Sequence, residues 1–259
     1  MIYRGEIMLT KIKMKLEISE NDSFNVNKSS LLHGVIMDTI SEDYAEAMHS
    51  SALKPYSQNI CRERDGSWIW CISALTDEAA EKIISPVSEL DEFLIKHNSM
   101  KIGVSAKEII RDSYDSLFER NYFGAELSRY VSFDIITPMS FKVNGRYINM
   151  PDPQLIIANL IHRYDAFSEH TEIYDEKLMS ELSERLCISS YDLRSTAFCL
   201  ESVRLPAFKG RFIIRVSGGR NLISLVNMLA DFAEFSGIGI KTALGMGAAA
   251  HIIQNRKEE

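Results

Sequence analysis

Alternating apolar and polar residues recur along the first half of the chain, separated by stretches with helical periodicity. The alternation from Met8 to Ile18 predicts a strand, because successive side chains of a strand point to opposite faces. Ser29 and Ser30 can cap a helix to about residue 40, and Ser41 can cap a second helix to about residue 50. After these come a predicted hairpin over 56–62 and 67–75, a helix over 78–84 capped by Thr76-Asp77, and a strand over 100–110.

The second half repeats this order of elements. A strand is predicted over 129–137, and Asp152-Pro153 begins a helix that reaches about residue 167, since proline favours the first helical turn. The other predicted elements are a helix over 175–186, paired strands over 190–201 and 208–217, a helix over 219–235 and a last strand over 246–253. Two β-α-β-β-α-β runs are typical of ferredoxin-like units. We therefore expect an α+β protein with two tandem ferredoxin-like (RRM-like) domains, residues 1–124 and 125–259.

The composition agrees with a globular protein and limits its functions. Hydrophobic residues make up 46% of the 259 residues and charged residues 25%, as is ordinary for soluble domains. No apolar run is long enough to span a membrane, and the N-terminal residues do not resemble a secretory signal. Neither cysteines nor histidines show metal-site spacing, so no metal or other cofactor is expected. We expect buried free thiols in a reducing cytoplasm at Cys61, Cys71, Cys187 and Cys199.

The charge is unevenly distributed along the chain. A net charge of −7 counts against a protein that coats nucleic acid without selectivity. One stretch is nevertheless basic, with Glu201 as its single acidic residue; its basic members are Arg194, Arg204, Lys209, Arg211, Arg215 and Arg220. We call these six residues the basic strip. A basic strip in an acidic protein suits one short polyanion, although a solvated strand face explains these residues equally well.

The segment from Gly237 to Gly247 reads GIGIKTALGMG and has the spacing GxG-x5-GxG with Lys241 between the glycine pairs. Glycine pairs let the backbone adopt positive φ and let a polyanion approach amide groups closely, and lysine supplies a mobile positive charge. The segment is neither a phosphate-binding P-loop nor a dinucleotide-binding loop, because no Gly-Lys-Ser/Thr follows and because it lies between a helix and a strand and not between a strand and a helix. A plain helix cap followed by a turn would need fewer glycines.

This segment resembles the signature of the CRISPR-associated repeat-processing endoribonucleases, which belong to the repeat-associated mysterious protein (RAMP) superfamily. Thr137-Pro138-Met-Ser-Phe141 resembles the Thr-Pro-x-x-Phe with which the second domain of these enzymes begins. Phe208-Lys209-Gly210 resembles their Phe-x-Gly strand start. The resemblance covers essentially the full chain and implies tandem ferredoxin-like domains, an RNA substrate and no metal cofactor. Gly237, Gly239, Lys241, Gly245, Gly247, Lys209 and Arg211 are the expected RNA-binding residues.

RNA cleavage without a metal requires groups that move protons and a positive charge near the phosphate. His49, at a predicted helix end, and Lys54, in the following loop, offer both. They resemble the family's Leu-His followed by Lys-Pro-Phe-Thr-x-Ser, which implies that His49 is the general acid or base and that Lys54 steadies the phosphate. Without the resemblance, a histidine at a helix end is more often a cap that interacts with the helix dipole.

Many members of the family carry a catalytic tyrosine on the preceding helix, at a place that counting assigns to Met37. Methionine cannot transfer a proton. His33 lies one helical turn earlier on the same face, and we expect it to take the missing role. A buried histidine bonded to a backbone carbonyl is an equally good interpretation of His33. Tyr44 is a weaker substitute, and the remaining histidines, including His251, look incidental.

The sequence thus favours an endoribonuclease that cuts CRISPR repeat RNA by attack of a 2′-hydroxyl, leaving 2′,3′-cyclic phosphate and 5′-hydroxyl ends. A non-catalytic RNA-binding subunit of a CRISPR effector complex is the first alternative, supported by the missing tyrosine. A regulatory module that binds free nucleotides ranks third. Besides repeat RNA, the sequence leaves open an effector complex and a second copy of the chain as partners, and it indicates no membrane.

Overall fold

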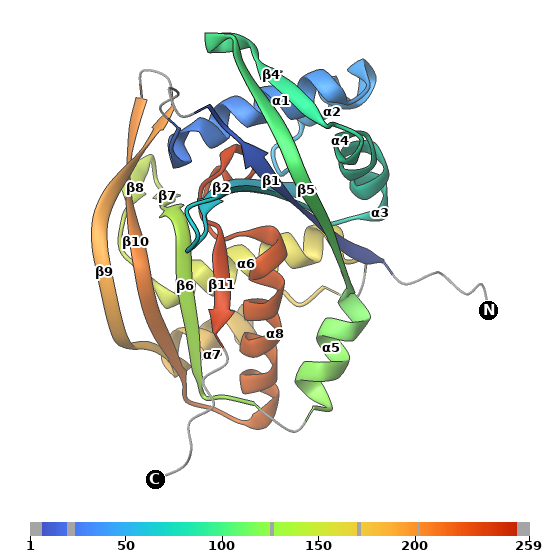
Figure 1. The fold of residues 1–259 in the computed structure, drawn as a ribbon. Helices are drawn as coiled ribbons and strands as arrows, with labels where there is room; N and C mark the ends of the chain where they lie inside the picture. The colour runs from blue at the N-terminus through green and yellow to red at the C-terminus, as the bar shows by residue number, and fades with distance from the viewer. Residues whose placement is uncertain (1–6, 20–23, 125–126, 170–171, 201–202, 253–259) are drawn as a thin grey trace, which may run out of the picture.

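A computed structural model describes residues 7–19, 24–124, 127–169, 172–200 and 203–252 of the chain. It contains two antiparallel sheets, each with helices packed against it, and the two units meet where β2 (Tyr56–Arg62) lies beside β6 (Tyr130–Met139) and α8 (Arg220–Ser236) (Figure 1). The predicted two-unit α+β architecture is therefore confirmed. The expected domain limits at residues 1, 125 and 259 fall outside the described residues, and the boundary itself stays a prediction.

The N-terminal sheet has the strand order β2-β3-β1-β5-β4. Its strands are β1 (Met8–Glu17), β2, β3 (Trp68–Ala74), β4 (Glu92–Ile95) and β5 (Met100–Ser113). α1 (Ser29–Thr39) and α2 (Glu42–Ser50) follow β1, and a second helical stretch follows β3: α3 (Asp77–Ala79), a π turn (Ala80–Ile84) and α4 (Ser85–Ser88). Thr76 caps this stretch as predicted, because its side chain accepts a hydrogen bond from the amide of Ala79 at 3.1 Å.

The C-terminal sheet has the order β11-β6-β10-β9. The first and third strands of this unit in chain order, β6 and β10, lie in the centre of the sheet. β1 and β3 have the same central position in the other sheet, as is characteristic of the ferredoxin-like arrangement. The elements are β6, α6 (Pro153–Phe167), α7 (Glu176–Arg185), β9 (Leu186–Leu200), β10 (Val203–Val216), α8 and β11 (Ala249–Ile252). The predicted helix over 153–167 matches α6 at both ends, and the Asp152 side chain caps it.

Three observed strands and one α-helix were missing from the sequence prediction. Besides β4, these are α5 (Tyr114–Tyr122) and the small hairpin β7 (Phe141–Val143) and β8 (Arg146–Ile148). The hairpin turns at Asn144-Gly145, where both residues have positive φ, a pairing that the sequence displays openly. The strand pattern of β4 is only four residues long, too short to distinguish from a loop.

The two hydrophobic cores exchange residues across the junction between the units. Leu9, Leu75, Tyr114 and Leu117 belong to the C-terminal core, whereas Ala243 belongs to the N-terminal core. The Tyr114 hydroxyl donates to the carbonyl of Leu75 at 2.9 Å within this junction. Neither unit therefore completes its core without the other. Among the described residues, no helix has the length and apolar character needed to cross a membrane.

Candidate functional site

His33 and Tyr56 meet where α1 packs on β2. His33 Nδ1 and the Tyr56 hydroxyl oxygen lie 2.7 Å apart, and the two rings are nearly parallel, at 10°. Tyr56 is fully buried and His33 is half-buried. The partner of His33 is therefore a phenol, and the interpretation of His33 as a histidine bonded to a backbone carbonyl is wrong for this ring nitrogen.

His49 lies in the last turn of α2, next to His33. The centroids of the two imidazole rings are 6.4 Å apart and their planes are nearly perpendicular, at 86°. Met48 is buried in the N-terminal core and holds this end of the helix, whereas His49 itself is exposed. The structure thus brings together the two histidines that the sequence analysis singled out, one anchored and one open to solvent.

Burial controls the protonation of the anchored pair. It lowers the pKa of His33 to about 4, with His49 and Lys54 adding smaller effects in the same direction, because both can carry positive charge. Burial raises the pKa of Tyr56, and Tyr44 adds to the rise. Near neutral pH His33 is accordingly neutral and Tyr56 keeps its proton. A buried hydroxyl needs an acceptor, and His33 Nδ1 is its acceptor among the described residues. Tyr56 therefore donates to Nδ1, which leaves the ring proton of His33 on Nε2.

Lys54 ties the loop after α2 to the end of the helix. Its ammonium donates to the carbonyls of Met48 and Ser51, which the last turn of a helix leaves without intrahelical partners. Burial lowers its pKa. An ammonium has three protons, so one donor remains for a ligand. Lys54 thereby fixes the position of His49 and places a positive charge beside the two rings.

Tyr44 and Met37, the other candidates for a third group, both pack against the N-terminal core. Burial, together with Glu78, raises the pKa of Tyr44 to about 12, so its hydroxyl is a poor proton-transfer group near neutral pH. Tyr56, which sequence reasoning missed as a functional residue, is the tyrosine that touches His33. Tyr56 directly follows Lys54-Pro55, the segment that resembles the family motif, so its position could have been noticed in the sequence. Its contact with His33 is visible only once β2 packs against α1.

The glycine-rich segment is mostly buried and its amides are paired within the protein. Gly237 donates to Ala233 O at 2.9 Å, Gly239 to Asn159 Oδ1 at 2.8 Å, Gly245 to Thr242 O at 3.3 Å and Gly247 to Pro138 O at 3.0 Å. A phosphate could reach these four amides only by displacing a protein acceptor. The RNA-binding role expected of the glycines stays a prediction, and Lys241 is the residue of the segment that is exposed.

The segment instead joins the two units. Thr137 Oγ1 accepts a hydrogen bond from the amide of Ala248 at 2.9 Å, and Ser140 O accepts one from the amide of Ile240 at 3.0 Å. The Thr-Pro-Met-Ser-Phe motif is therefore bonded to the glycine-rich segment and to the residue that follows it. The short 3-10 turn Thr242–Leu244 lies on β2 and α1. There, Gln58 Nε2 donates to Ala243 O at 3.2 Å and to Ser29 O at 2.7 Å. The segment therefore holds the elements that carry His33 and Tyr56.

Four residues of the basic strip lie along β10, and Arg194 lies opposite Lys209 on β9. A register shift between Phe208 and Gly210 keeps Lys209 and the arginines after it outside the core. Arg211 forms an ion pair with Asp134 at 3.2 Å. The end of β9 reaches the start of α1, where the amide of Cys199 donates to Asn27 Oδ1 at 3.1 Å. Arg220 lies apart, at the start of α8, and Glu201 lies outside the described residues.

Neither cysteines nor acidic residues form a metal site in the described part of the chain, where no three potential ligands gather. All four cysteines are free, as expected. The expectation that all are buried is wrong: Cys61 and Cys71 are half-buried, and Cys187 and Cys199 are exposed. The last two lie on β9, an edge strand whose side chains have few neighbours on the outer face.

The sequence also gave no sign of the contacts of His251. Its Nδ1 lies 2.7 Å from Asp231 Oδ1, and the other carboxylate oxygen accepts from Arg120 Nε at 3.0 Å and Asn121 Nδ2 at 2.8 Å. This group of four residues joins β11, α8 and α5. Asp231 is 20 positions from His251 in the chain and more than 100 from Arg120 and Asn121, which is why no local motif shows these contacts.

Comparisons with known proteins agree with the resemblance. A family model described as CRISPR-associated endoribonuclease Cas6 matches residues 133–249. A protein of that name from Streptococcus thermophilus is 30% identical over 227 residues, 87% of this chain and 91% of that protein. Another, from Mycobacterium tuberculosis, is 32% identical over 219 residues, 84% of this chain and 69% of that protein.

Solved structures show the same fold. Thermus thermophilus Cas6 aligns with a TM-score of 0.75 at 20% identity, over 96% of this chain and 100% of that one. A Cas6 product complex aligns with a TM-score of 0.79 at 21% identity, over 95% of this chain and 99% of that one. A RAMP protein described as binding different RNA substrates aligns with a TM-score of 0.64 at 16% identity, over 94% and 100% of the two chains.

Proposed function

Because this chain belongs to the Cas6 family of CRISPR-associated endoribonucleases, we propose that it cleaves CRISPR repeat RNA without a metal ion. The observation that carries the proposal is the cluster of His33, His49, Lys54 and Tyr56, which combines a half-buried neutral imidazole, an exposed imidazole and a cation. These are the groups that 2′-hydroxyl attack on a phosphate requires.

The reaction moves two protons and exchanges one bond for another. The 2′-hydroxyl loses its proton, its oxygen bonds to phosphorus, the bond from phosphorus to the 5′ oxygen breaks, and that oxygen takes a proton. We assign removal of the first proton to His49, which is exposed and so able to reach RNA. Lys54 supplies positive charge to the phosphorane; its pKa, lowered by burial, also makes it a better proton donor to the 5′ oxygen.

His33 takes a narrower role than the sequence predicted. Proton transfer was the role expected of His33 from the sequence, but the Tyr56 contact favours the tautomer with the proton on Nε2. A neutral imidazole in this tautomer donates a hydrogen bond and does not act as a base at that nitrogen. We therefore assign His33 to donate Nε2–H to a non-bridging phosphate oxygen, where negative charge grows during the reaction.

The basic strip and Lys241 are the groups we assign to hold the RNA. Lys209 and Arg211 extend outward from β10, and the adjoining β9 ends beside the start of α1, on which His33 lies. The strand pair thus offers a charged path toward the cluster. The glycines Gly237, Gly239, Gly245 and Gly247 would contribute by placing Lys241 and the elements around the cluster, since their amides already have protein acceptors.

Cleavage of repeat RNA in the presence of a chelator tests the chemistry. We expect full activity with excess EDTA and no cutting of RNA that carries a 2′-deoxy nucleotide at the cleavage position. The products should end in 2′,3′-cyclic phosphate and 5′-hydroxyl groups. Cutting of the deoxy substrate at an unchanged rate would contradict the proposed attack, and loss of activity restored by a divalent ion would contradict metal independence.

Substitution of the exposed histidine tests the site. His49→Ala should abolish cleavage and leave the affinity for repeat RNA within about threefold, because the ring acts on a proton and makes little of the binding surface. His162→Ala, at an exposed position of α6, is the matched control and should cleave normally. Tight binding with no cleavage by the unaltered chain would support the alternative of a non-catalytic RNA-binding subunit.

A further inference from the structure

An apolar groove lies between α5 and the helices α6, α7 and α8 of the C-terminal unit, on the part of the molecule away from α1 and α2 (Figure 1). Its volume is about 660 Å³. Five aliphatic side chains and three aromatic rings make most of its lining: Ile173, Leu178, Leu222, Leu225, Met228, Phe118, Tyr122 and Tyr164. Neither the cluster around His33 nor the basic strip contributes to it, so the proposed cleavage leaves this groove without a role.

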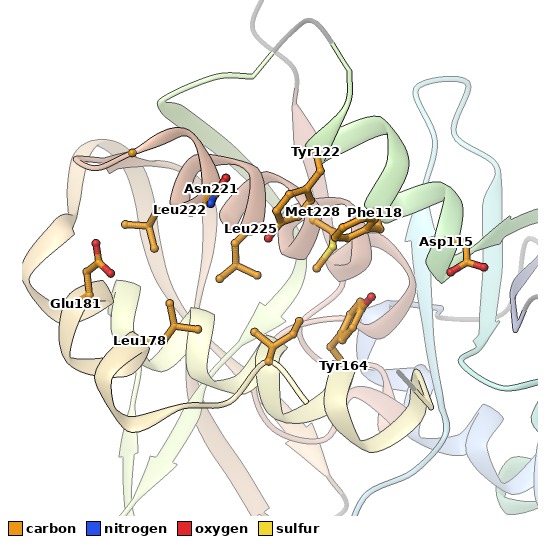
Figure 2. Close-up of a pocket in the computed structure, with 12 residues that line it drawn as sticks. Asp115, Phe118, Tyr122, Tyr164, Leu178, Glu181, Asn221, Leu222, Leu225 and Met228 are labelled. Atoms are coloured by element: carbon orange, nitrogen blue, oxygen red, sulfur yellow. The ribbon is translucent and has the colours of Figure 1, made fainter. Parts of the chain in front are cut away.

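The carboxylates of the groove lie at its ends. Figure 2 shows Glu181 of α7 at one end and Asp115 of α5 at the other, with apolar side chains in a row between them. Among the residues that line the groove, none is basic. Phe118 in the lining is 40% exposed, and the neighbouring Phe123 and Tyr174 are 77% and 58% exposed. Such a large open apolar surface with a polar edge is typical of an interaction site.

The backbone around the groove restricts the form of the occupant. All lining residues except Ile173 and Gly219 belong to α5, α6, α7 and α8, whose backbone groups are bonded within the helices. An extended peptide would find no sheet edge among these lining residues to pair with. A helix brings its own hydrogen bonds and can bury a row of side chains at positions i, i+3 or i+4, and i+7.

The charges indicate which helix fits. Carboxylates at both ends favour an occupant with basic residues flanking its apolar row. A second copy of this chain is disfavoured as the occupant, because a twofold contact would bring the Asp115 and Glu181 carboxylates of two copies together. We propose that the groove binds an amphipathic α-helix of a partner protein, with an apolar face and lysine or arginine at both ends. This inference does not depend on the proposed cleavage.

Two labelled helical peptides test the proposal by fluorescence anisotropy with the full chain. Both carry leucine at positions i, i+3, i+4 and i+7 in an alanine-rich background of about 15 residues. One peptide has lysines at its ends and the other has glutamates. We expect the lysine-ended peptide to bind at least tenfold more tightly. Glu181→Lys should weaken its binding at least fivefold, and Phe118→Ala should weaken the binding of both peptides.

The control separates this site from the general acidity of the protein. Glu89→Lys changes the net charge equally but lies at the exposed end of α4, and it should leave binding within twofold. An equal loss with Glu89→Lys, equal binding of the two peptides, or no binding of the lysine-ended peptide would overturn the proposal. So would competition between this peptide and repeat RNA, or self-association of the chain that Phe118→Ala abolishes.

Discussion

At the scale of single residues, the Tyr56 hydroxyl decides which nitrogen of His33 carries the proton. The two groups come from different elements and lie 2.7 Å apart in a setting that keeps Tyr56 protonated and His33 neutral. A histidine in one fixed tautomer presents either a donor or an acceptor to a substrate, never both at the same nitrogen. The chemistry available to this site therefore depends on a residue that is fully buried and does not itself reach the RNA.

Tyr56→Phe should slow cleavage of bound RNA roughly fivefold, because loss of one hydrogen bond that fixes the tautomer is worth about 1 kcal/mol. The rate is measured in single-turnover reactions with excess protein. Tyr44→Phe is the control, because Tyr44 is half-buried and packs against the same core as Tyr56. Equal slowing by both substitutions would show that the effect comes from packing and not from His33.

The low pKa of His33 links stability to pH. Between the ordinary value of 6.5 and about 4, the unfolded chain binds a proton at His33 that the folded chain does not. The free energy of unfolding should therefore fall as the pH is lowered through this range. In His33→Asn this contribution is absent, so the free energy of unfolding should decrease less over the same pH range. One full proton corresponds to about 1.4 kcal/mol per pH unit. The difference between the two proteins should be smaller than this, because His33 is only half-buried.

Urea unfolding of both proteins between about pH 7 and about pH 4.5 measures the difference. His97→Asn is a suitable comparison, because its side chain is exposed. Parallel pH profiles for the unaltered chain and His33→Asn would contradict the assigned protonation of His33.

At the scale of elements, the glycine-rich segment acts through shape. Gly245 has a φ of +106°, and a Cβ there would lie 2.1 Å from Ser29 Cβ, at the start of the helix that carries His33. Gly245 is thus required where a loop of one unit touches a helix of the other. A Cβ at Gly239 or Gly247 would meet a backbone oxygen, that of Ser140 or Ile238, within the C-terminal unit. Close packing therefore explains these glycines, whereas none of these contacts explains Lys241.

Gly245→Ala should lower the free energy of unfolding by roughly 2–5 kcal/mol, since it adds backbone strain and forces α1 away from the loop. Gly34→Ala is the matched control on α1, where an added Cβ meets no atom within 4 Å. That substitution should stabilise the protein by roughly 0.5–1 kcal/mol, because alanine favours the helix. Chemical denaturation compares the two, and a neutral Gly245→Ala would argue against the close contact.

At the scale of the whole molecule, the two ferredoxin-like units are interlocked. Ser57 Oγ donates to Phe235 O at 2.5 Å, and Arg120 on α5 pairs with Asp231 on α8 at 3.0 Å. Together with the residues that each core takes from the other half of the chain, these contacts span the whole junction. The cluster of His33, His49 and Tyr56 lies in the N-terminal unit, but its geometry depends on the C-terminal glycine segment.

The chain should consequently unfold in one transition. Both tryptophans, Trp68 and Trp70, lie on β3, so their fluorescence reports on the N-terminal unit alone, while far-ultraviolet circular dichroism reports on both. We expect the two signals to coincide during urea unfolding. Fragments 1–124 and 125–259 expressed separately should be unfolded or aggregated. Two resolved transitions, or a fragment with native-like stability, would contradict the interlocking.

Features that depend on neighbouring residues could be predicted from the amino-acid sequence. Period-two alternation identified β1, the Asp152-Pro153 start identified α6, and Thr76 identified the helical stretch after β3, because each of these signals acts within a few residues. The glycine spacing and the Thr-Pro-x-x-Phe motif indicated the family. His33, His49 and Lys54 were selected by their chemistry together with that resemblance.

The partners of these residues became visible in the folded protein and could not be predicted from the sequence. Tyr56 is 23 positions from His33, Gly245 is more than 200 from Ser29, and the groove of α5 to α8 gathers side chains from Asp115 to Met228. Contacts of this kind arise from the packing of whole elements and leave no periodicity in the sequence. The physical reason is that burial and long-range hydrogen bonds are properties of the assembled fold. Burial lowers the pKa of His33, and hydrogen bonds to other segments pair the amides of Gly239 and Gly247.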